Sequence, residues 1–323
     1  MSEARSDVRP DGAVTESGRP RPTRRRVIAG GVLAGAGIAG GTLLATRDRG
    51  PAVGTTVRAR RVHGTLPVDD PTAGAWGQTG SVLVELERQA TTTPMKTRGK
   101  GVDHVEVEAL HDGTSIAFRL QWDDPERDSD GAGVDVWRDA CAVLLARSHA
   151  DEAQRLMGTA DEAASILHWK ADWQRDIDEG FQDVEAHFPN AAYGFYPPLV
   201  GVDRTARAAD YTAADATEWL PALAAGNPLA PATRTSPVEK IRAHGYGTAA
   251  SLPTQNARGK GEWDDGRWRV VLARPLARTD SDEVHINPGA DAGFAVAVWR
   301  GDEDDGGSRK SLAKVLLRLE VAP

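Results

Sequence analysis

The chain has 323 residues, of which 40% are hydrophobic and 27% charged, and its formal net charge is −8. This balance is typical of a soluble globular protein with one large or two small domains, and it excludes collagen-like, coiled-coil and polytopic membrane proteins. The single cysteine, Cys141, excludes an internal disulfide framework, a cysteine-ligated iron–sulfur cluster and c-type haem attachment. The first 50 residues hold nine arginines against five acidic residues, which leaves −12 for the remainder and argues against nucleic-acid binding.

The N-terminal segment has the features of an export address. Residues 1–22 are polar, and we interpret them as a disordered leader. The paired arginines Arg24 and Arg25 then precede the glycine-rich, weakly apolar run Val27–Ala45, which is typical of a twin-arginine export signal. Because no clean Ala-x-Ala cleavage site follows, an uncleaved N-terminal anchor is the alternative. We therefore divide the chain into an address segment, 1–50, and a body, 51–323.

The body alternates apolar and polar residues over short segments, which predicts β-strands. Val102–Leu110 and Ser115–Trp122 flank an Asp-Gly turn and predict a hairpin. A second hairpin is predicted around the Asp-Gly turn between Trp263 and Trp268. Further strands are predicted at Ser81–Leu86, Ala140–Ala146, Ser165–Trp169, Trp268–Arg274, Ala292–Trp299 and Leu312–Val321.

Helical patterns in the body are few and short. They occur at Asp151–Met157, Gln174–Ala186 and Ala213–Ala224. The stretch Asp176–Gly259 has weak periodicity and many prolines and glycines, and we interpret it as a long insertion across the mouth of a β-domain. Many strands and few helices predict a mainly β fold, a two-sheet antiparallel β-sandwich with short helices and one long insertion.

Familiar catalytic and metal motifs are absent from the sequence. It has no signature of a serine hydrolase, a zinc protease, a P-loop or a dinucleotide-binding turn, and its eight histidines are scattered. The acidic run 302–305 lacks the alternating spacing of a calcium loop, and we interpret it as a solvated turn. After the start residue only Met95 and Met157 carry a thioether, a group that fills gaps in cores and also ligates soft metals.

The order of several segments resembles the haem-binding γ subunit of ethylbenzene dehydrogenase and its relatives. These relatives are subunits of dimethyl sulfide, selenate and chlorate enzymes in the dimethyl sulfoxide reductase superfamily. The segments that carry the resemblance are Trp76, Val102–Trp122, Asp139–Val143, Met157-Gly158, His168–Gln174, Trp268–Leu276, Phe294–Gly301 and Arg309–Ser311. Together they span most of residues 60–321.

The resemblance implies a β-sandwich that binds one b-type haem between methionine and lysine axial ligands. Met157 matches the methionine of the Met-Gly motif, and Lys310 matches the lysine that follows the Phe294–Trp299 strand. Lys314 is the nearest competitor of Lys310. A thioether favours ferrous iron and raises the haem potential, and a lysine ligates only as its neutral amine.

Other residues are expected around such a haem. His168 is a candidate for axial ligation, for a hydrogen bond to a haem propionate, or for a structural role. Trp169 and Phe294 are expected to wall an inter-sheet cavity together with Phe118, Leu120 and Val296. Lys170 and Arg119 are candidate partners of the haem propionates.

Two functions of different classes follow from these observations. The first is a non-catalytic electron-transfer subunit of an exported molybdenum oxidoreductase complex. It would pass electrons between an iron–sulfur subunit, next to the molybdopterin catalytic subunit, and an external carrier. The second is a carbohydrate-binding β-sandwich module without haem, and a haem-free relative that keeps only the scaffold is a third. A buried Met157–Lys310 pair would separate the first from the others, because a sugar-binding module has no use for it.

Overall fold

The fold is mainly β, as predicted, and its strands form one connected set. The structure, a computed structural model, describes residues 52–89, 99–131, 133, 135–182, 184–187, 216–231 and 233–323. The strands are β1 (Ala52–Val53), β2 (Thr56–Arg61), β3 (Val82–Arg88), β4 (His104–His111), β5 (Ser115–Asp123), β6 (Ala140–Ala146), β7 (Ala164–Lys170), β8 (Val238–Ala243), β9 (Ala250–Ser251), β10 (Arg258–Asp264), β11 (Arg267–Pro275), β12 (Asp291–Trp299), β13 (Ser311–Ala313) and β14 (Leu317–Val321). The α-helices in these ranges are α1 (Ala171–Glu179), α2 (Val184–His187), α3 (Ala216–Trp219) and α4 (Pro221–Ala224).

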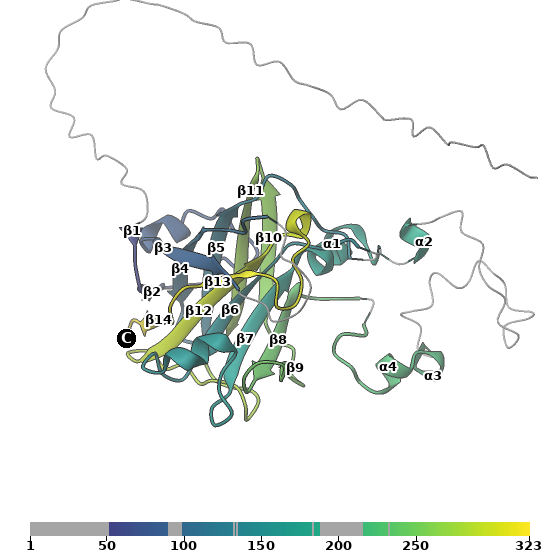
Figure 1. Ribbon diagram of the computed structural model, residues 1–323. Coiled ribbons are helices and arrows are strands. Elements are labelled where there is room, and N and C mark those ends of the chain that lie inside the picture. The colour runs from purple at the N-terminus through teal and green to yellow at the C-terminus, as the bar shows by residue number, and fades with distance from the viewer. Residues whose placement is uncertain are drawn as a thin grey trace, which may run out of the picture. The chain divides into compact units, whose positions relative to one another are not determined.

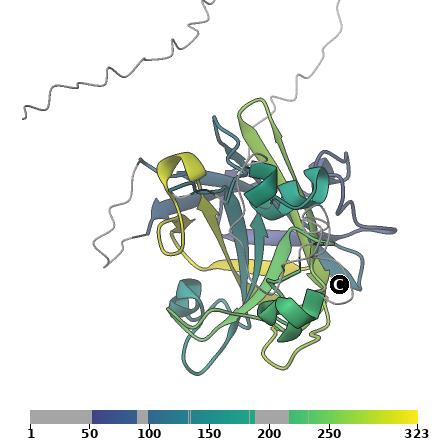
Figure 2. The same cartoon turned by 90° about the vertical axis from the view of Figure 1, so that its right-hand side faces the viewer.

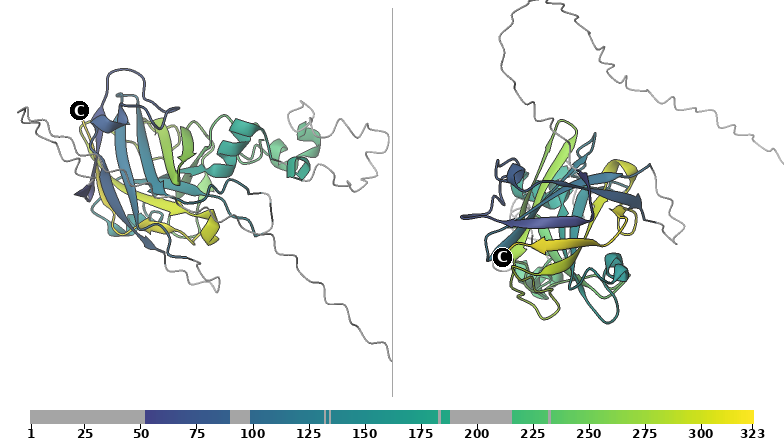
Figure 3. Two further views of the ribbon diagram at one scale, coloured as in Figure 1. Left: turned by 90° about the horizontal axis from the view of Figure 1, so that it is seen from above. Right: turned by 90° about the vertical axis from the view of Figure 1, so that its left-hand side faces the viewer.

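The strands pack as two layers that join at one side (Figure 1). The first layer is β10-β11-β5-β4 and the second is β12-β6-β7-β8-β9, with β2 and β14 inserted between β4 and β12. Most pairs are antiparallel, but β2 pairs in parallel with both β4 and β14, and β1 pairs in parallel with β3. A second link runs from β4 through β3 and β13 to β12. The predicted sandwich is therefore confirmed, and its two sheets are continuous with each other (Figure 2 and Figure 3).

The interior between the layers is filled by large aromatic side chains. Phe118 on β5 packs against Phe294 on β12, with ring centroids 5.2 Å apart. Trp169 on β7 meets Trp268 on β11 edge-on at 4.9 Å, and Trp122 stacks on the same Trp268. These rings are fully buried, and they hold the two layers together through aromatic contacts and loss of apolar surface from water.

Both layers are also covered on their outer faces. The segment between β2 and β3 places Leu66, Val68 and Trp76 over the outer face of the first layer, against Leu110 and Val271. Loops cover the outer face of the second layer, so every residue of β6 is buried. Burial on both faces explains why β6 and β12 read as continuous apolar runs instead of alternating ones.

The predicted insertion 176–259 contains parts of the sheet. Strands β8 and β9 lie inside it, β10 begins at Arg258, and α1 already starts at Ala171. The part outside the sheet therefore runs from about Gly180 to Pro237, and most of its middle lies outside the described residues. Strand β8 escaped prediction because Glu239 and Lys240 interrupt its apolar pattern, although both are buried in ion pairs. The predicted address segment, 1–50, also lies outside the described residues.

Candidate functional site

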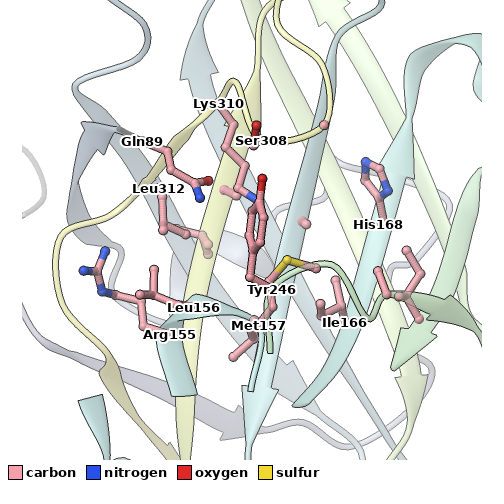
Figure 4. Close-up of a pocket in the computed structure, with 18 of the residues that line it drawn as sticks. Gln89, Arg155, Leu156, Met157, Ile166, His168, Tyr246, Ser308, Lys310 and Leu312 are labelled. Atoms are coloured by element: carbon pink, nitrogen blue, oxygen red, sulfur yellow. The ribbon is translucent and has the colours of Figure 1, made fainter. Parts of the chain in front are cut away.

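A pocket of about 660 Å³ lies on the outer face of the second layer. That volume falls within the range of about 300–1,000 Å³ that small-molecule and cofactor sites occupy. Its floor consists of outward-facing residues of β6, β7 and β12, and three of these are alanines, which leaves room above the sheet. The floor residues are Ala142, Leu144, Ile166, His168, Ala295, Ala297 and Trp299. Met157, Tyr246 and Lys310 approach from the covering loops (Figure 4).

Met157 is held in place by an unusual backbone conformation. The 3₁₀ turn Glu152–Leu156 is capped by Asp151, whose side chain accepts from the Ala153 N–H at 3.0 Å. Met157 ends this turn with φ 75° and ψ 36°, in the left-handed region that L-residues seldom adopt. Its carbonyl accepts from the Gly245 N–H at 2.8 Å, which ties the loop to the β8–β9 connection. Met157 is partly buried and packs against the main core cluster.

The glycine after Met157 is required by space as well as by conformation. Gly158 has φ +79°, and a Cβ there would lie 2.6 Å from the Ala243 carbonyl oxygen and 2.8 Å from the Ala164 nitrogen. These are backbone atoms, so they cannot rotate away. Met157 and Gly158 thus form a tight turn before β7 that directs the Met157 side chain into the pocket.

Gly158→Ala should therefore destabilise the protein more than a matched substitution that meets only open space. Gly247 is the control, because its φ is +81° and nothing lies within 4 Å of its Cβ position. We expect Gly247→Ala to cost about 1–2 kcal/mol from the left-handed conformation alone. Gly158→Ala should cost a further 1–3 kcal/mol, roughly, from the forced backbone shift. Urea denaturation of both variants measures the difference, and equal losses would show that the close approach is unimportant.

Lys310 enters the pocket from the segment that joins β12 to β13. Its backbone carbonyl accepts from the Gln89 N–H at 2.9 Å, which fixes the residue beside the end of β3. The side chain is 8% exposed, and its amine lies 4.9 Å from the centroid of the Trp299 indole. No carboxylate of the described residues pairs with this amine, so burial lowers the pKa of Lys310 to about 8. A neutral amine is therefore accessible near physiological pH.

The segment that carries Lys310 is anchored by two buried carboxyl groups. Asp139 accepts from the Gly301 N–H at 2.9 Å and from the Trp268 indole N–H at 2.9 Å. Asp124 accepts from the Trp122 indole at 3.3 Å and lies 3.7 Å from the Arg300 guanidinium. Burial raises the pKa of Asp124 to about 7 and that of Asp139 to about 8, where the charge of Asp124 adds to the effect of burial.

From the raised pKa values of Asp124 and Asp139 we predict that the free energy of unfolding falls as the pH rises. Unfolded aspartates release their protons near pH 3.9, whereas the folded pair holds them to about pH 7 and 8. Between pH 3.9 and these higher pKa values, the folded state keeps a proton on each aspartate that the unfolded state has released. Each aspartate therefore lowers the free energy of unfolding by about 1.4 kcal/mol per pH unit. Asp124→Asn should make the decline between pH 5 and 6.5 shallower by about that amount, measured by chemical denaturation. An unchanged slope would mean that Asp124 is ionised throughout.

His168 lies on β7 and, with Trp299 of β12, forms part of the pocket floor. Its ring packs on the Trp299 indole at 4.9 Å between centroids, and Trp299 is itself fixed because its N–H donates to the Gly307 carbonyl at 3.0 Å. Among the described residues nothing hydrogen-bonds to the buried Nε2 of His168. Burial, and then the cations Lys170, Arg138 and Lys310, hold the pKa of His168 well below its usual value. The imidazole is therefore neutral.

The structure thus brings together three of the six residues predicted for the site, Met157, Lys310 and His168. Trp169 and Phe294 instead lie in the core between the layers, because side chains alternate along a strand and theirs take the other face. Phe118 and Leu120 are buried there too, so the predicted inter-sheet position of the cavity is corrected: of the five expected wall residues only Val296 lines the pocket.

The predicted basic partners lie elsewhere and carry partners of their own. Lys170 is ion-paired with Glu239 and sits 3.8 Å from the centroid of the Trp173 ring. Arg119 is paired with Glu108 on the first layer. Lys314, the competitor of Lys310, is exposed, does not line the pocket and lies 3.7 Å from a carboxylate oxygen of Glu85.

Sequence reasoning missed five polar or aromatic residues of the pocket. These are Gln89, Arg155, Tyr246, Trp299 and Ser308. The sequence predicts that Trp299 lies in a strand. A single sequence does not show that this strand places Trp299 next to His168. Tyr246 is flanked by Gly245 and Gly247, both with positive φ, and it is 66% exposed at the mouth of the pocket.

The side-chain donors of the pocket suit a transition metal that is already part of a cofactor. A thioether and a neutral amine both bind transition metals, and the apolar floor would keep water away from them. Among the described residues no three His, Cys, Asp or Glu side chains gather as a metal cluster. The pocket therefore offers the thioether of Met157, the amine of Lys310 and the imidazole of His168, and a metal held by these groups needs further ligands, which a cofactor would supply. In the same part of the chain no helix is long and apolar enough to span a bilayer.

Comparison with known proteins gives a family and one similar curated protein. The family described as ethylbenzene dehydrogenase matches residues 73–311. A protein of Haloferax mediterranei, named as a respiratory nitrate reductase heme subunit, is 19% identical over 272 residues, which cover 81% of this chain and 75% of that protein.

Similar solved structures are carbohydrate-binding proteins, at low similarity. A family 9 carbohydrate-binding module from Caldicellulosiruptor kristjanssonii, bound to cellotriose, matches with a TM-score of 0.35 and 9% identity, over 83% of this chain and 93% of the module. A protein of Bacteroides uniformis described as carbohydrate-binding matches with a TM-score of 0.42 and 8% identity, over 83% of this chain and 99% of that one. Both scores are too low to argue from.

Proposed function

Since this chain belongs to the ethylbenzene dehydrogenase family, we propose that it is a haem-binding electron-transfer subunit of a molybdenum oxidoreductase complex. The observation that carries the proposal is the convergence of Met157 and Lys310 in one apolar pocket (Figure 4). The two residues are far apart in the sequence, and each comes from a separate covering loop. The name of the Haloferax relative supports haem as the group that is bound.

The residues present fit a b-type haem. The Met157 sulfur and the Lys310 amine would hold its iron, and the amine would not have to leave an ion pair, because it has none among the described residues. The alanines of the floor leave space beside the sheet for a flat ring. When bound, the haem supplies reversible one-electron transfer at the iron.

Met157, Gly158 and Lys310 each have a defined role in that function. Burial lowers the pKa of Lys310 to about 8, so the neutral amine with its free lone pair is more accessible at neutral pH than in an exposed lysine. The left-handed turn at Met157 and the tight Gly158 fix the direction of the sulfur, a soft donor that favours the reduced metal. If Met157 and Lys310 both hold the haem iron, they would leave no coordination position for a substrate, and the subunit would transfer electrons without itself being catalytic. Electrons would pass between an iron–sulfur subunit, next to a molybdopterin catalytic subunit, and an external carrier.

The test is the colour and stoichiometry of the purified full-length protein. We expect one non-covalent haem per chain and sharp low-spin bands after reduction with dithionite. Lys314→Ala is the matched control: it removes an exposed lysine four residues away and should leave the bands unchanged. A colourless protein that takes up no haem, and instead binds cello-oligosaccharides in calorimetry, would overturn the proposal.

We also propose that the chain is exported by the twin-arginine route to the periplasm or the outer face of the cytoplasmic membrane. The support is the Arg24-Arg25 pair ahead of the weakly apolar run 27–45. That route carries folded proteins, so the cofactor could be inserted before export. Replacing both arginines by lysine should leave the protein in the cytoplasm, as measured by cell fractionation. Normal export of this variant, with an intact control that carries Arg47→Lys, would contradict the route.

A further inference from the structure

His168 lines the same pocket as Met157 and Lys310, and the proposed function gives it no role. It stands on β7 with Ala142 opposite it on β6, so its ring projects over the small residues of the floor. Figure 4 shows it on the side of the pocket away from Gln89 and Arg155, whereas Lys310 and Met157 come from the two covering loops. It therefore faces the edge of whatever flat group lies between those two residues.

The imidazole is built into this position and yet lacks a partner. Its ring rests on the Trp299 indole, which is locked by a hydrogen bond to Gly307. Its Nε2 is buried and has no hydrogen-bond partner among the described residues. Leaving a buried polar atom without a partner is costly, and such atoms in native proteins are normally completed by a ligand or water. The nitrogen is thus available to a group that enters the pocket.

The surroundings of His168 favour a negatively charged group. The side chains that act on it electrostatically are the cations Lys170, Arg138 and Lys310. Lys170 and Arg138 are paired with Glu239 and Asp172, while Lys310 has no carboxylate partner. An anion at this edge would gain an N–H donor and meet no opposing carboxylate in the pocket lining, which contains neither Asp nor Glu.

We propose that His168 donates a hydrogen bond from Nε2 to a carboxylate at the edge of the bound cofactor, and so fixes the orientation in which the ring enters the pocket. The proposal rests on the proposed haem function. It makes His168 a cofactor-binding residue and not an axial ligand, because Met157 and Lys310 supply the two axial donors. Haem b carries its two carboxylates on one edge, so this contact is made only when that edge of the ring faces His168.

The experiment compares two probes on the apo-protein: haem and its dimethyl ester, in which both carboxylates are blocked. Wild type should bind haem about ten- to a hundredfold more tightly than the ester, as expected for a hydrogen bond to a charged group. His168→Leu should lose most of this preference and keep its affinity for the ester. His168→Gln, which retains an N–H donor, should restore most of it. The low-spin spectrum should be the same in all three proteins.

Controls separate this inference from its alternatives. Gln89→Leu, on the other side of the pocket, should leave the preference intact; if Gln89→Leu or Arg155→Gln abolishes it instead, the carboxylates lie on that side and the assignment to His168 is overturned. Loss of the low-spin bands in His168→Leu would make it an axial ligand, again against the proposal. If His168→Leu weakens the binding of haem and of the ester equally, His168 contributes only packing, which also contradicts the proposal. If wild type binds neither probe, the proposed function itself fails.

Discussion

Lys310→Ala should convert the bound haem from a six-coordinate, low-spin state to a high-spin state. The substitution removes the only described lysine that lines the pocket, and no other amine there can take its place. Optical and electron paramagnetic resonance spectra of the variant measure the change, and added imidazole should restore the low-spin bands by entering the open position. Lys314→Ala provides the control, since that side chain points to Glu85 at the surface. A low-spin spectrum in Lys310→Ala without added ligand would contradict the assignment.

A second prediction for Lys310 concerns the stability of the protein without haem. In the apo-protein, burial lowers the pKa of Lys310 from 10.5 to about 8, so its protonated form is disfavoured in the fold. The cost is present in full below pH 8 and is relieved as the pH rises from 8 to 10.5. Apo Lys310→Met should therefore exceed wild type in stability by about 3 kcal/mol at pH 7, and the gap should close toward pH 10.5. A gap that does not change with pH would show that the amine is solvated.

Met157→Leu should weaken haem binding and lower the reduction potential of whatever haem remains. Leucine fills a similar volume without sulfur, so the variant removes the donor atom and keeps the packing. The loss of affinity should exceed the roughly 10- to 100-fold that removing an outer-shell partner of a metal ligand costs. The potential should fall because the thioether stabilises the reduced iron. Haem titration and redox titration measure the two effects.

Leu156→Ala is the matched control for Met157→Leu. Leu156 also lines the pocket, next to Met157, but it is 47% exposed and has no donor atom. It should change the affinity only slightly and leave the potential alone. If the two variants behave alike, Met157 contributes apolar contact and not ligation.

Much of the fold was predictable because local pattern and burial agree in its hairpins. The β4–β5 and β10–β11 hairpins have Asp-Gly turns and alternating flanks, and the predicted strand Ala140–Ala146 matches β6 residue for residue. Strand β2 could not be found in this way, since Arg58, Arg60 and Arg61 dominate it and only Val57 and Ala59 are buried. The predicted helix Ala213–Ala224 is two short helices in the part that is described, because Pro221 starts a new one.

The position of the pocket could not be derived from alternation. Alternation places His168 on one face of β7 and Leu167 and Trp169 on the other, but it does not say which face is the interior. The large aromatic side chains suggested that the cavity lies with Trp169 and Phe294. In the fold these rings instead pack against one another in the core, and the pocket lies over the alanines of the opposite face. A space for a ligand is marked here by small side chains, which composition and hydropathy do not distinguish from ordinary core.

The position of β14, parallel to β2 and antiparallel to β12, limits when the fold can close during synthesis. Strand β14 is formed by residues 317–321, and it joins the two layers next to a strand made of residues 56–61. While the chain is being synthesised, the first layer and the second layer can each pair their own hairpins, but they cannot be closed on this side until residue 321 has left the ribosome. Lys310 emerges only shortly before that moment. The pocket therefore cannot be complete until Lys310 has been synthesised, so a cofactor that binds there would be loaded only after translation has passed that residue.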